Sequence, residues 1–323
     1  MFAVAATSFD SDNPLNGLTL GEMPDTQVPE GWVRVNLRAA SLNHHDLWSL
    51  KGVGLREDRL PMILGCDAAG VLDDGSAVVV HGVVGDPNAV GGDETLDPKR
   101  TLLSELYPGT FAETVAVPAR NVIAKPEELS FEQAACLPTA WLTAYRMLAT
   151  KSGLTPGGTV LIQGAGGGVA TAATQLAKAM GYRVWVTSRD EAKRARAVEL
   201  GADEAFEIGA RLPDRVDAVI ETVGEATWSH SLKSLRPGGT VVVSGATSGP
   251  NPPADLNRVF FLQLNVVGST MGTRDELEAM LALLADTGVR PTIDATYDLR
   301  DARSAFERLN SGDVVGKLVL TNN

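Results

Sequence analysis

The residues with the clearest chemical potential form a glycine cluster directly after a short apolar run. Residues 160–162 are apolar, and after Gln163 the cluster comprises Gly164, Gly166, Gly167 and Gly168, with Val169 beginning an Ala-rich stretch of helical periodicity. Glycines at a strand-to-helix turn let backbone N–H groups approach a pyrophosphate, which then lies at the positive end of the helix. Because the strand and the helix can both be recognised, the segment predicts a dinucleotide-binding turn. The alternative is a glycine-rich turn without a ligand.

A hydroxyl and basic side chains follow the next expected strand, at residues 183–187. NAD-specific domains carry an acidic residue at this strand end, where it binds the ribose diol. Here the position falls on Ser188, followed by Arg189, and Lys193 lies one helical turn further on. A hydroxyl and a guanidinium would hold a 2′-phosphate by charge-assisted hydrogen bonds, so the pattern favours NADP(H). Two alternatives stay open: Ser188 or Asp190 caps the next helix while Arg189 is solvated, or Asp190 binds the ribose diol.

The composition is typical of a globular protein of more than one domain. The 323 residues exceed one ordinary core, and 44% of them are hydrophobic. The formal net charge of −12 disfavours nucleic acid and anionic membranes as partners. No apolar stretch approaches the ~20 residues that span a bilayer, and the N-terminus lacks the basic region of a signal peptide. The only two cysteines cannot form a disulfide framework, which favours a cytoplasmic location.

The first part of the chain has the pattern of short strands separated by turns. Residues 32–39 alternate as a half-buried strand does, and residues 75–81 hold a Val-rich strand. The polar stretch at residues 82–109 indicates a surface loop or lobe. Ser130 is placed to cap a helix that continues, interrupted by Pro138, towards residue 148.

The second part alternates strands with helices, which predicts a parallel sheet covered on both faces. The expected strands are residues 159–163, 183–187, 216–220, 240–244 and 265–269, and the expected helices are 168–180, 190–200 and 226–235. Gly201 fits a helix end, and the Pro-Gly-Gly at residues 237–239 fits a turn. Helices near 274–287 and 300–310 and a strand at 316–321 follow, and this last strand is expected to rejoin the first domain.

Several blocks along the chain together resemble the medium-chain dehydrogenase/reductase superfamily, and most closely its zinc-free quinone and enone reductase branch, the zeta-crystallin-like proteins. The blocks are residues 41–47 (SLNHHDL), 60–70 (LPMILGCDAAG), 109–113 (GTFAE), 137–145 (LPTAWLTAY), the glycine turn and 316–320 (GKLVL). The resemblance implies an α/β protein with a GroES-like β-barrel catalytic domain at residues 1–128 and 270–323. It also implies a Rossmann domain, a doubly wound parallel sheet, at residues 129–269, with the active site between the two. Ala170 stands where the family's turn usually has its last glycine, a change that close helix–strand packing tolerates.

The resemblance also bears on metal binding. Zinc-dependent relatives hold catalytic zinc with Cys, His and Cys, and these positions fall on Asn43, Cys66 and about Ala140 here. A catalytic zinc ion needs three protein ligands, and only Cys66 is a soft one. The relatives' structural zinc lobe uses four cysteines, whereas the polar stretch described above has none. We therefore expect a zinc-free protein, with a rearranged site of Cys66, Asp46, Asp67 and a nearby histidine as the alternative.

The resemblance implies catalytic or cofactor-binding roles for residues of the first of these blocks, residues 41–47. Asn43 could donate a hydrogen bond to the substrate oxygen, or it could only satisfy buried backbone groups. His44 aligns with a residue that contacts the cofactor pyrophosphate. His45 aligns with a proton-relaying hydroxyl and could deliver a proton, or it could face solvent. Asp46 is expected to orient this loop.

The remaining cofactor contacts are also implied by the resemblance. They comprise Thr143, the strand-end residues Thr222, Gly245, Ala246 and Thr247, the nicotinamide-side residues Thr270 and Met271, and Lys317 near the C-terminus. For Lys317 a structural surface charge is an equally good interpretation.

The function we expect is NADPH-dependent hydride transfer to a quinone or an α,β-unsaturated carbonyl without zinc. The substrate is expected to be small and hydrophobic, not a CoA ester. The alternatives are an alcohol dehydrogenase with an atypical metal site, a non-catalytic NADPH-binding redox sensor, and a trans-acting enoyl reductase of polyketide assembly. The apolar run at residues 259–268 could form an exposed strand edge that pairs two copies into a homodimer, or it could be ordinary core.

Overall fold

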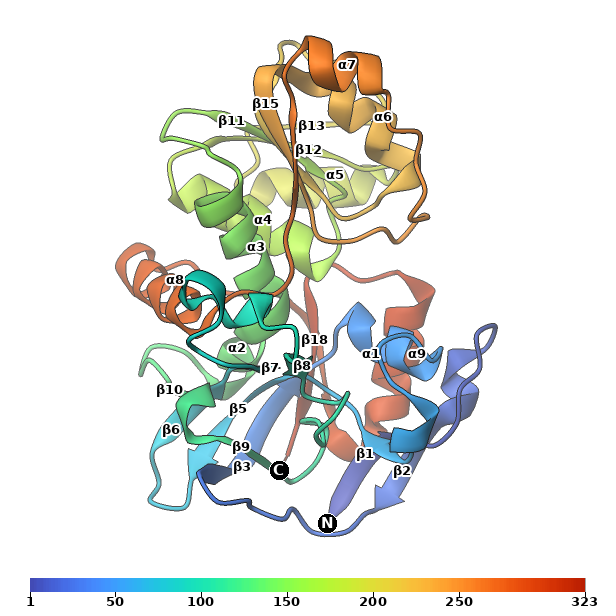
Figure 1. The fold of residues 1–323 in the computed structure, drawn as a ribbon, viewed down its shortest axis with the longest axis vertical. Coiled ribbons are helices and arrows are strands. Elements are labelled where there is room, and N and C mark those ends of the chain that lie inside the picture. Colours follow the sequence, from blue (N-terminus) through green and yellow to red (C-terminus); the bar gives the residue numbers. More distant parts are fainter. Residues whose placement is uncertain (323) are drawn as a thin grey trace. The chain divides into compact units, whose positions relative to one another are not determined.

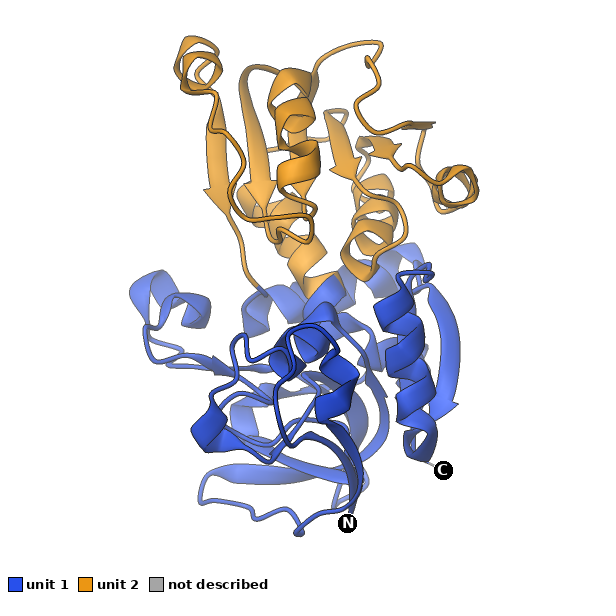
Figure 2. Cartoon of the chain, turned by 90° about the vertical axis from the view of Figure 1, so that its right-hand side faces the viewer, with its two compact units in different colours: residues 1–140, 271–323 blue, residues 141–270 orange. Residues whose placement is uncertain are grey.

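The structure, a computed structural model, describes residues 1–322, and the chain forms two compact units (Figure 2). Unit 1 comprises residues 1–140 and 271–323, and unit 2 comprises residues 141–270. The sequence blocks placed the first boundary at residue 129. The compact unit extends further because helix α2 (Phe131–Ala135) packs on strands β3 (Trp32–Ser41) and β5 (Asp67–Leu72) of unit 1.

Unit 1 is built on a largely antiparallel sheet with β3 near its centre (Figure 1). Its strand order is β10-β6-β5-β3-β18-β17, and β9 also pairs with β3. The further strands are β6 (Ala77–Val80), β9 (Thr114–Pro118), β10 (Val122–Ala124), β17 (Ile293–Asp298) and β18 (Lys317–Thr321). A smaller sheet has the order β2-β1-β4, from β1 (Phe2–Ala6), β2 (Leu18–Glu22) and β4 (Met62–Ile63).

The last strand confirms that the C-terminal segment rejoins the first domain. β18 runs antiparallel to β3, with Val319 opposite Ser41. The apolar face of β3, with Val35 and Leu37 fully or almost fully buried, packs into a core that includes the edge-to-face pair Phe111 and Phe306. This pairing brings the beginning of β18 beside the end of β3.

Four α-helices and a lobe complete the described part of unit 1. The helices are α1 (His44–Leu50), α2, α8 (Arg274–Thr287) and α9 (Ala302–Ser311). Ser130 caps α2, as predicted, because its hydroxyl accepts a hydrogen bond from the Gln133 backbone N–H. Residues 82–109, called the lobe below, carry a two-stranded sheet of β7 (Val83–Val84) and β8 (Thr101–Leu102).

Unit 2 is a six-stranded parallel sheet with the order β13-β12-β11-β14-β15-β16. Its strands are β11 (Thr159–Gln163), β12 (Arg183–Thr187), β13 (Glu204–Phe206), β14 (Val216–Glu221), β15 (Leu235–Val243) and β16 (Asn265–Gly268). Its helices are α3 (Leu142–Arg146), α4 (Gly168–Ala179), α5 (Glu191–Glu199), α6 (Glu225–Ser234) and α7 (Leu256–Phe261). The predicted doubly wound sheet is confirmed.

Two details of unit 2 differ from the sequence predictions. The Pro-Gly-Gly expected to be a turn lies within β15, where pairing with β14 is interrupted and Gly238 takes a φ of +74°. Part of the apolar run 259–268 belongs to helix α7, and only residues 265–268 form the edge strand β16.

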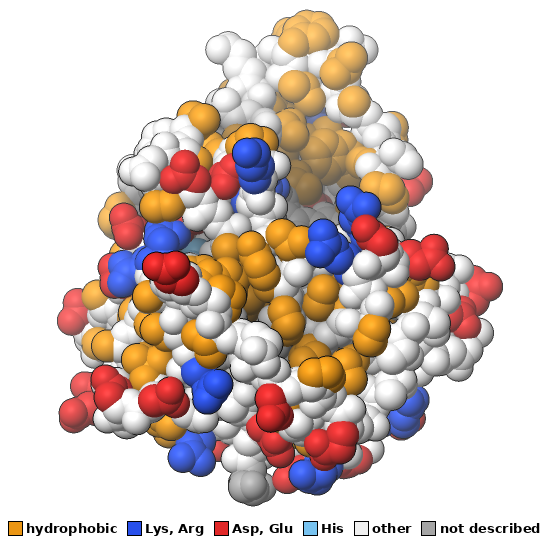
Figure 3. All heavy atoms as spheres, turned by 60° about the horizontal axis from the view of Figure 1, so that its bottom comes forward, with side chains coloured by type: hydrophobic (Ala, Val, Ile, Leu, Met, Phe, Trp, Pro, Cys, Tyr) orange, Lys and Arg blue, Asp and Glu red, His pale blue; other side chains and the backbone are white. Residues whose placement is uncertain are grey.

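The surface carries charges of both signs. On the face in Figure 3, Asp and Glu side chains are scattered around the outer part of the molecule, with Lys and Arg between them. Within residues 1–322, no helix is both long and apolar enough to cross a membrane.

Candidate active site

The segment that joins β3 to α1 is held in place by a buried carboxylate. Asp46 is fully buried, and its oxygens accept hydrogen bonds from the backbone N–H groups of Asn43 (2.7 Å) and Gly65 (3.2 Å). Burial raises the pKa of Asp46 from 3.8 to about 6, although the neighbouring His45 acts to lower it. Asp46 therefore orients the loop, as the sequence analysis expected, and it acts through the backbone.

A buried ammonium lies beside this loop. Lys317 Nζ, at the start of β18, donates to the carbonyl oxygen of Leu42 (2.7 Å) and the side-chain oxygen of Asn43 (2.6 Å). It also lies 3.3 Å from Asp67 Oδ2, and the Lys317 side chain is only 3% exposed. Three oxygen partners satisfy the three donors of an ammonium. Lys317 is therefore buried and is not a surface charge, and its ammonium is hydrogen-bonded within unit 1. Its role in cofactor binding stays a prediction.

Asn43 is committed to the same group of contacts. Its Nδ2 donates to Asp67 Oδ2 (2.8 Å) and, at 3.4 Å, to the carbonyl oxygen of Ser41. The orientation of the amide is fixed because its oxygen faces the Lys317 ammonium and its nitrogen faces a carboxylate. The predicted donation to a substrate oxygen is thus corrected in favour of the alternative, that Asn43 satisfies buried groups.

The carboxylate of Asp67 is unevenly satisfied. Its Oδ2 accepts from Ser41, Asn43 and Lys317, whereas its Oδ1 is buried and has no hydrogen-bond partner in the part of the chain that the structure describes. The Ser41 hydroxyl lies 2.9 Å from Oδ2. Ser41 was not among the predicted site residues, and Asp67 was named only as a ligand of the alternative metal site, because their contacts depend on the β3–β5 and β3–β18 pairing.

The residues at the family's zinc-ligand positions do not fit a zinc ion. The Asn43 oxygen and the Asp67 carboxylate are already paired with an ammonium, which would repel a divalent cation. Ala140 has no donor atom. Among residues 1–322, no three His, Cys, Asp or Glu side chains are grouped so that they could hold a metal.

Cys66, His45 and Glu105 form a second chain of contacts in unit 1. His45 Nδ1 lies 3.4 Å from Cys66 Sγ, and His45 Nε2 lies 3.1 Å from Glu105 Oε1. The Cys66 thiol donates to the carbonyl oxygen of Leu103 (3.2 Å) and is fully buried, as expected for a small packed residue. Glu105 lies in the lobe and is itself held by the Leu102 N–H (3.0 Å). Sequence analysis missed Glu105, because nothing in the polar lobe distinguishes it from its acidic neighbours.

The charges around His45 favour its protonated form. Burial lowers the pKa of His45, but Cys66, Glu105 and Asp46 raise it, and the net pKa lies well above 6.5. Both ring nitrogens face protein groups, so His45 donates both of its N–H groups within unit 1. His44, by contrast, is exposed at the start of α1.

The glycine turn of unit 2 has the geometry that anion binding requires. β11 ends at Gln163, Gly164 has a φ of +87°, and Gly167 is the N-cap of the 12-residue helix α4. A Cβ placed on Gly167 would meet nothing within 4 Å, so the helix N-terminus is open there. Backbone N–H groups and the helix dipole at such an N-terminus attract phosphate.

The residues after β12 lie as predicted at the strand end. Ser188 directly follows the last strand residue, Thr187, and is 7% exposed. Asp190 is the N-cap of α5, where its carboxylate accepts the Lys193 N–H (3.1 Å). The alternative in which Asp190 is a cap is therefore realised, and Arg189 is exposed beside it.

The other predicted cofactor residues of unit 2 lie mostly after parallel strands. Thr222 follows β14, residues 245–247 follow β15, and Thr270 follows β16. Thr143 is buried on α3, and Met271 begins the return to unit 1. Ligands of such sheets bind beyond the carboxyl ends of the strands, which is where all but Thr143 are placed.

A barrel-type unit with a buried polar centre and a parallel sheet with a glycine turn together define a two-domain nicotinamide-dependent oxidoreductase. Comparison with known families agrees. Residues 29–127 match the alcohol dehydrogenase GroES-like domain, and residues 168–286 match the zinc-binding dehydrogenase family. The chain belongs to the medium-chain dehydrogenase/reductase superfamily.

Similar proteins include enzymes with different substrates. An acryloyl-coenzyme A reductase of Metallosphaera sedula is 31% identical, over 94% of this chain and 96% of its own length. An alcohol dehydrogenase of Geobacillus stearothermophilus is 31% identical over 94% of this chain and 95% of its own. The crystal structure of an NAD-dependent alcohol dehydrogenase matches the whole of both chains with a TM-score of 0.92 and 33% identity.

Proposed function

We propose that this protein is an NADPH-dependent reductase that transfers hydride to a conjugated carbonyl compound or a quinone without zinc. The observation that carries the proposal is the Lys317 ammonium, which is bound to Asp67 and to Asn43, the latter at a position where zinc-dependent relatives have a zinc ligand. A fixed internal cation makes a divalent ion at this place unfavourable. Reduction of a conjugated double bond does not require a metal-bound alkoxide, so this chemistry agrees with the residues present.

Unit 2 supplies the groups that would hold the cofactor. The N–H groups at the start of α4 would bind the pyrophosphate, and Ser188 with Arg189 would bind the 2′-phosphate. A carboxylate directly after β12 would repel that phosphate, and the first acidic side chain after the strand, Asp190, is used as a helix cap. When bound, the reduced nicotinamide supplies the hydride.

Unit 1 supplies fixed positive charge. The protonated His45 carries a positive charge that favours an electron-rich oxygen in its vicinity. Because both nitrogens of His45 are bonded to protein groups, we assign the final protonation of the substrate carbon to water and give His45 a positioning role. This replaces the direct proton delivery expected from the sequence.

A conjugated carbonyl is favoured as the substrate class. Acryloyl-coenzyme A, which the Metallosphaera sedula relative is named for, contains an α,β-unsaturated thioester. We propose that this chain uses the same conjugated unit in a small, uncharged compound. A cytoplasmic location stays part of this proposal.

A substrate panel tests the proposal. NADPH oxidation is followed with a conjugated cyclic enone, a simple quinone and acryloyl-coenzyme A, and the matched saturated ketone is the control. We expect turnover with the enone and the quinone, and none with acryloyl-coenzyme A or the saturated ketone. NAD⁺-driven oxidation of alcohols by zinc-loaded protein would contradict the proposal, and tight NADPH binding without any turnover would favour the sensor alternative.

We further propose that two copies pair along β16. This strand is at one end of the sheet, and its Val266 is 51% exposed. The adjacent helix α7 exposes Leu256, Phe260 and Phe261, the last at 78%. An exposed strand edge with apolar neighbours is suited to pairing with a second copy.

A further inference from the structure

Residues 269–272 connect the ligand-binding edge of unit 2 to unit 1. They directly follow β16, whose carboxyl end lies at the same edge of the parallel sheet as the glycine turn after β11. The Ser269 hydroxyl is buried and has no hydrogen-bond partner among residues 1–322. A buried hydroxyl without a partner is rare, and it marks a place where a ligand can supply one.

The strand order indicates which end of a dinucleotide would reach this segment. The 2′-phosphate site follows β12 and the pyrophosphate site follows β11, and the order continues through β14 and β15 to β16. A dinucleotide that starts at β12 and crosses β11 must therefore extend towards β16. Residues 269–272 lie at the nicotinamide end.

His81 of unit 1 holds this segment from one side. His81 lies just after β6 and is fully buried, and its Nε2 donates to the carbonyl oxygen of Gly272 (2.9 Å). Burial lowers the pKa of His81, which favours the neutral ring. Its proton is then on Nε2, because the partner there is a carbonyl oxygen, and Nδ1 faces Glu94 Oε1 at 4.0 Å.

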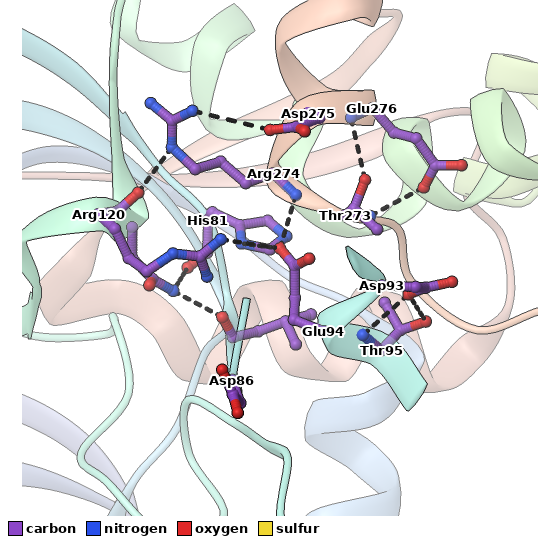
Figure 4. A network of polar contacts seen from close by, with 12 residues as sticks. His81, Asp86, Asp93, Glu94, Thr95, Arg120, Thr273, Arg274, Asp275 and Glu276 are labelled. Carbon is purple, nitrogen blue, oxygen red and sulfur yellow. Dashed lines mark hydrogen bonds and ion pairs between the residues drawn. The ribbon is translucent and has the colours of Figure 1, made fainter. Parts of the chain in front are cut away.

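Glu94 of the lobe, next to His81, holds the beginning of the helix that follows this segment (Figure 4). Its carboxylate is 2% exposed and accepts the backbone N–H of Arg274 (2.8 Å), the first residue of the 14-residue helix α8. An anion at a helix N-terminus is stabilised by the helix dipole. The Arg120 guanidinium lies 3.6 Å from the same Glu94 oxygen. The backbone carbonyl oxygen of Arg120 accepts a hydrogen bond from Arg274 Nε (2.8 Å).

The backbone between these anchors is in an uncommon conformation. Met271 has a φ of +51°, a left-handed conformation that costs energy for a residue with a side chain. Gly272 and Arg274, which follow Met271 closely in the chain, are hydrogen-bonded to His81 and Glu94. These hydrogen bonds compensate for the conformational cost at Met271. The anchors fix the backbone of residues 272–274, directly after the point where the chain enters unit 1.

We propose that His81 and Glu94 are positioning residues for the nicotinamide end of the cofactor. His81 and Glu94 form hydrogen bonds with the backbone of Gly272 and Arg274. Because Met271 and Ser269 closely precede these residues in the chain, the hydrogen bonds restrict the backbone of Met271 and Ser269 as well. Neither His81 nor Glu94 is assigned a contact with the cofactor. The inference rests on the proposed NADPH binding and extends it to residues outside the dinucleotide-binding unit.

Two ligands separate this role from general damage. NADPH carries the nicotinamide, and 2′-phospho-ADP-ribose has the same 2′-phosphate and pyrophosphate without it. His81→Leu removes the donor to Gly272, and Glu94→Ala removes the acceptor for Arg274. We expect each variant to bind NADPH about tenfold more weakly, the loss of about one hydrogen bond, while its dissociation constant for 2′-phospho-ADP-ribose stays unchanged.

Two control variants distinguish the loss of these hydrogen bonds from a general effect of substitution. His81→Gln places an amide N–H near the position of Nε2 and is expected to restore most of the NADPH affinity. Asp97→Asn removes a lobe carboxylate that accepts only the nearby Asp86 and Lys99 N–H groups, and it is expected to change neither ligand. Unfolding temperatures are measured for every variant.

The outcomes are distinguishable. Unchanged NADPH binding by both His81→Leu and Glu94→Ala would overturn the inference, as would an equal loss for both ligands in folded variants. If one variant does not fold, the other decides by the same comparison. Failure of the unaltered protein to bind either ligand would instead contradict the proposed function.

Discussion

The ammonium nitrogen of Lys317 lies 2.6 Å from the side-chain oxygen of Asn43, although the two residues are 274 positions apart. The pairing of β18 with β3 creates this contact, and Asp67 of β5 completes it. One internal cation thereby fixes the loop before α1 and neutralises a fully buried carboxylate. Removal of one partner from such a buried pair leaves the other charge uncompensated.

Lys317→Met is expected to destabilise the protein strongly. It leaves the buried Asp67 carboxylate without its cation, and we expect a loss of about 3–5 kcal/mol in the free energy of unfolding, measured with urea. Lys178→Met is the matched control, because Lys178 pairs with Asp203 but is 50% exposed. That change is expected to cost about 0–1 kcal/mol. Equal losses in the two variants would contradict the structural role of Lys317.

His45 is expected to make stability depend on pH. Its pKa is raised above the unfolded value of 6.5, so its contribution is full below about pH 6.5 and is lost as pH rises through the folded pKa. The free energy of unfolding of the unaltered protein should therefore exceed that of His45→Gln most at low pH, and the difference should shrink above pH 6.5.

Glu105 provides an independent check of this electrostatic arrangement. Glu105→Gln removes a carboxylate that raises the pKa of His45, so the histidine should titrate at lower pH in the variant. NMR titration of the chain's four histidines measures this directly. A His45 signal that titrates below pH 6.5 in the unaltered protein would be inconsistent with the contacts described.

Ser188→Asp is expected to reverse the cofactor preference. The new carboxylate would lie where the 2′-phosphate binds, and we expect it to weaken NADPH binding by at least about tenfold while NADH binding is retained or improved. Arg189→Ala should also weaken NADPH binding, without any gain for NADH. Dissociation constants from cofactor fluorescence decide this, and tighter binding of NADH than NADPH by the unaltered protein would refute the preference.

Phe261→Asp and Val266→Lys are expected to separate the proposed dimer into monomers. Both residues are exposed apolar groups beside the β16 edge, and a charge there would have to be desolvated on pairing. Light scattering during size-exclusion chromatography measures the mass. Leu96→Asp, an equally apolar exposed position in the lobe, serves as control. An unaltered protein that is monomeric would remove this proposal.

The fold of unit 2 was predictable because buried parallel strands are continuous apolar runs. β11 and β12 occupy the residues predicted for them, and the turn after β11 was identified from its glycines. The exceptions are informative. The Pro-Gly-Gly within β15 has the local chemistry of a turn, and only the pairing with β14 on both sides of it shows that the strand resumes after it.

The polar centre of unit 1 was less predictable because its contacts join distant segments. Lys317 and Asp67 are 250 residues apart, and Glu105 meets His45 from a lobe of irregular structure. A buried lysine cannot be distinguished from a surface lysine by its neighbours in sequence. The resemblance to known dehydrogenases identified Asn43, His45 and Cys66 as site positions, but their partners required the strand register.

The central claim is hydride transfer from NADPH without a metal ion, and one measurement tests it most directly. Protein purified with a strong chelator is assayed for NADPH oxidation by a conjugated enone, and its zinc content is determined in the same sample. The account predicts full activity with far less than one zinc ion per chain and no increase when zinc is added. Loss of activity on chelation, restored by one equivalent of zinc, would contradict it.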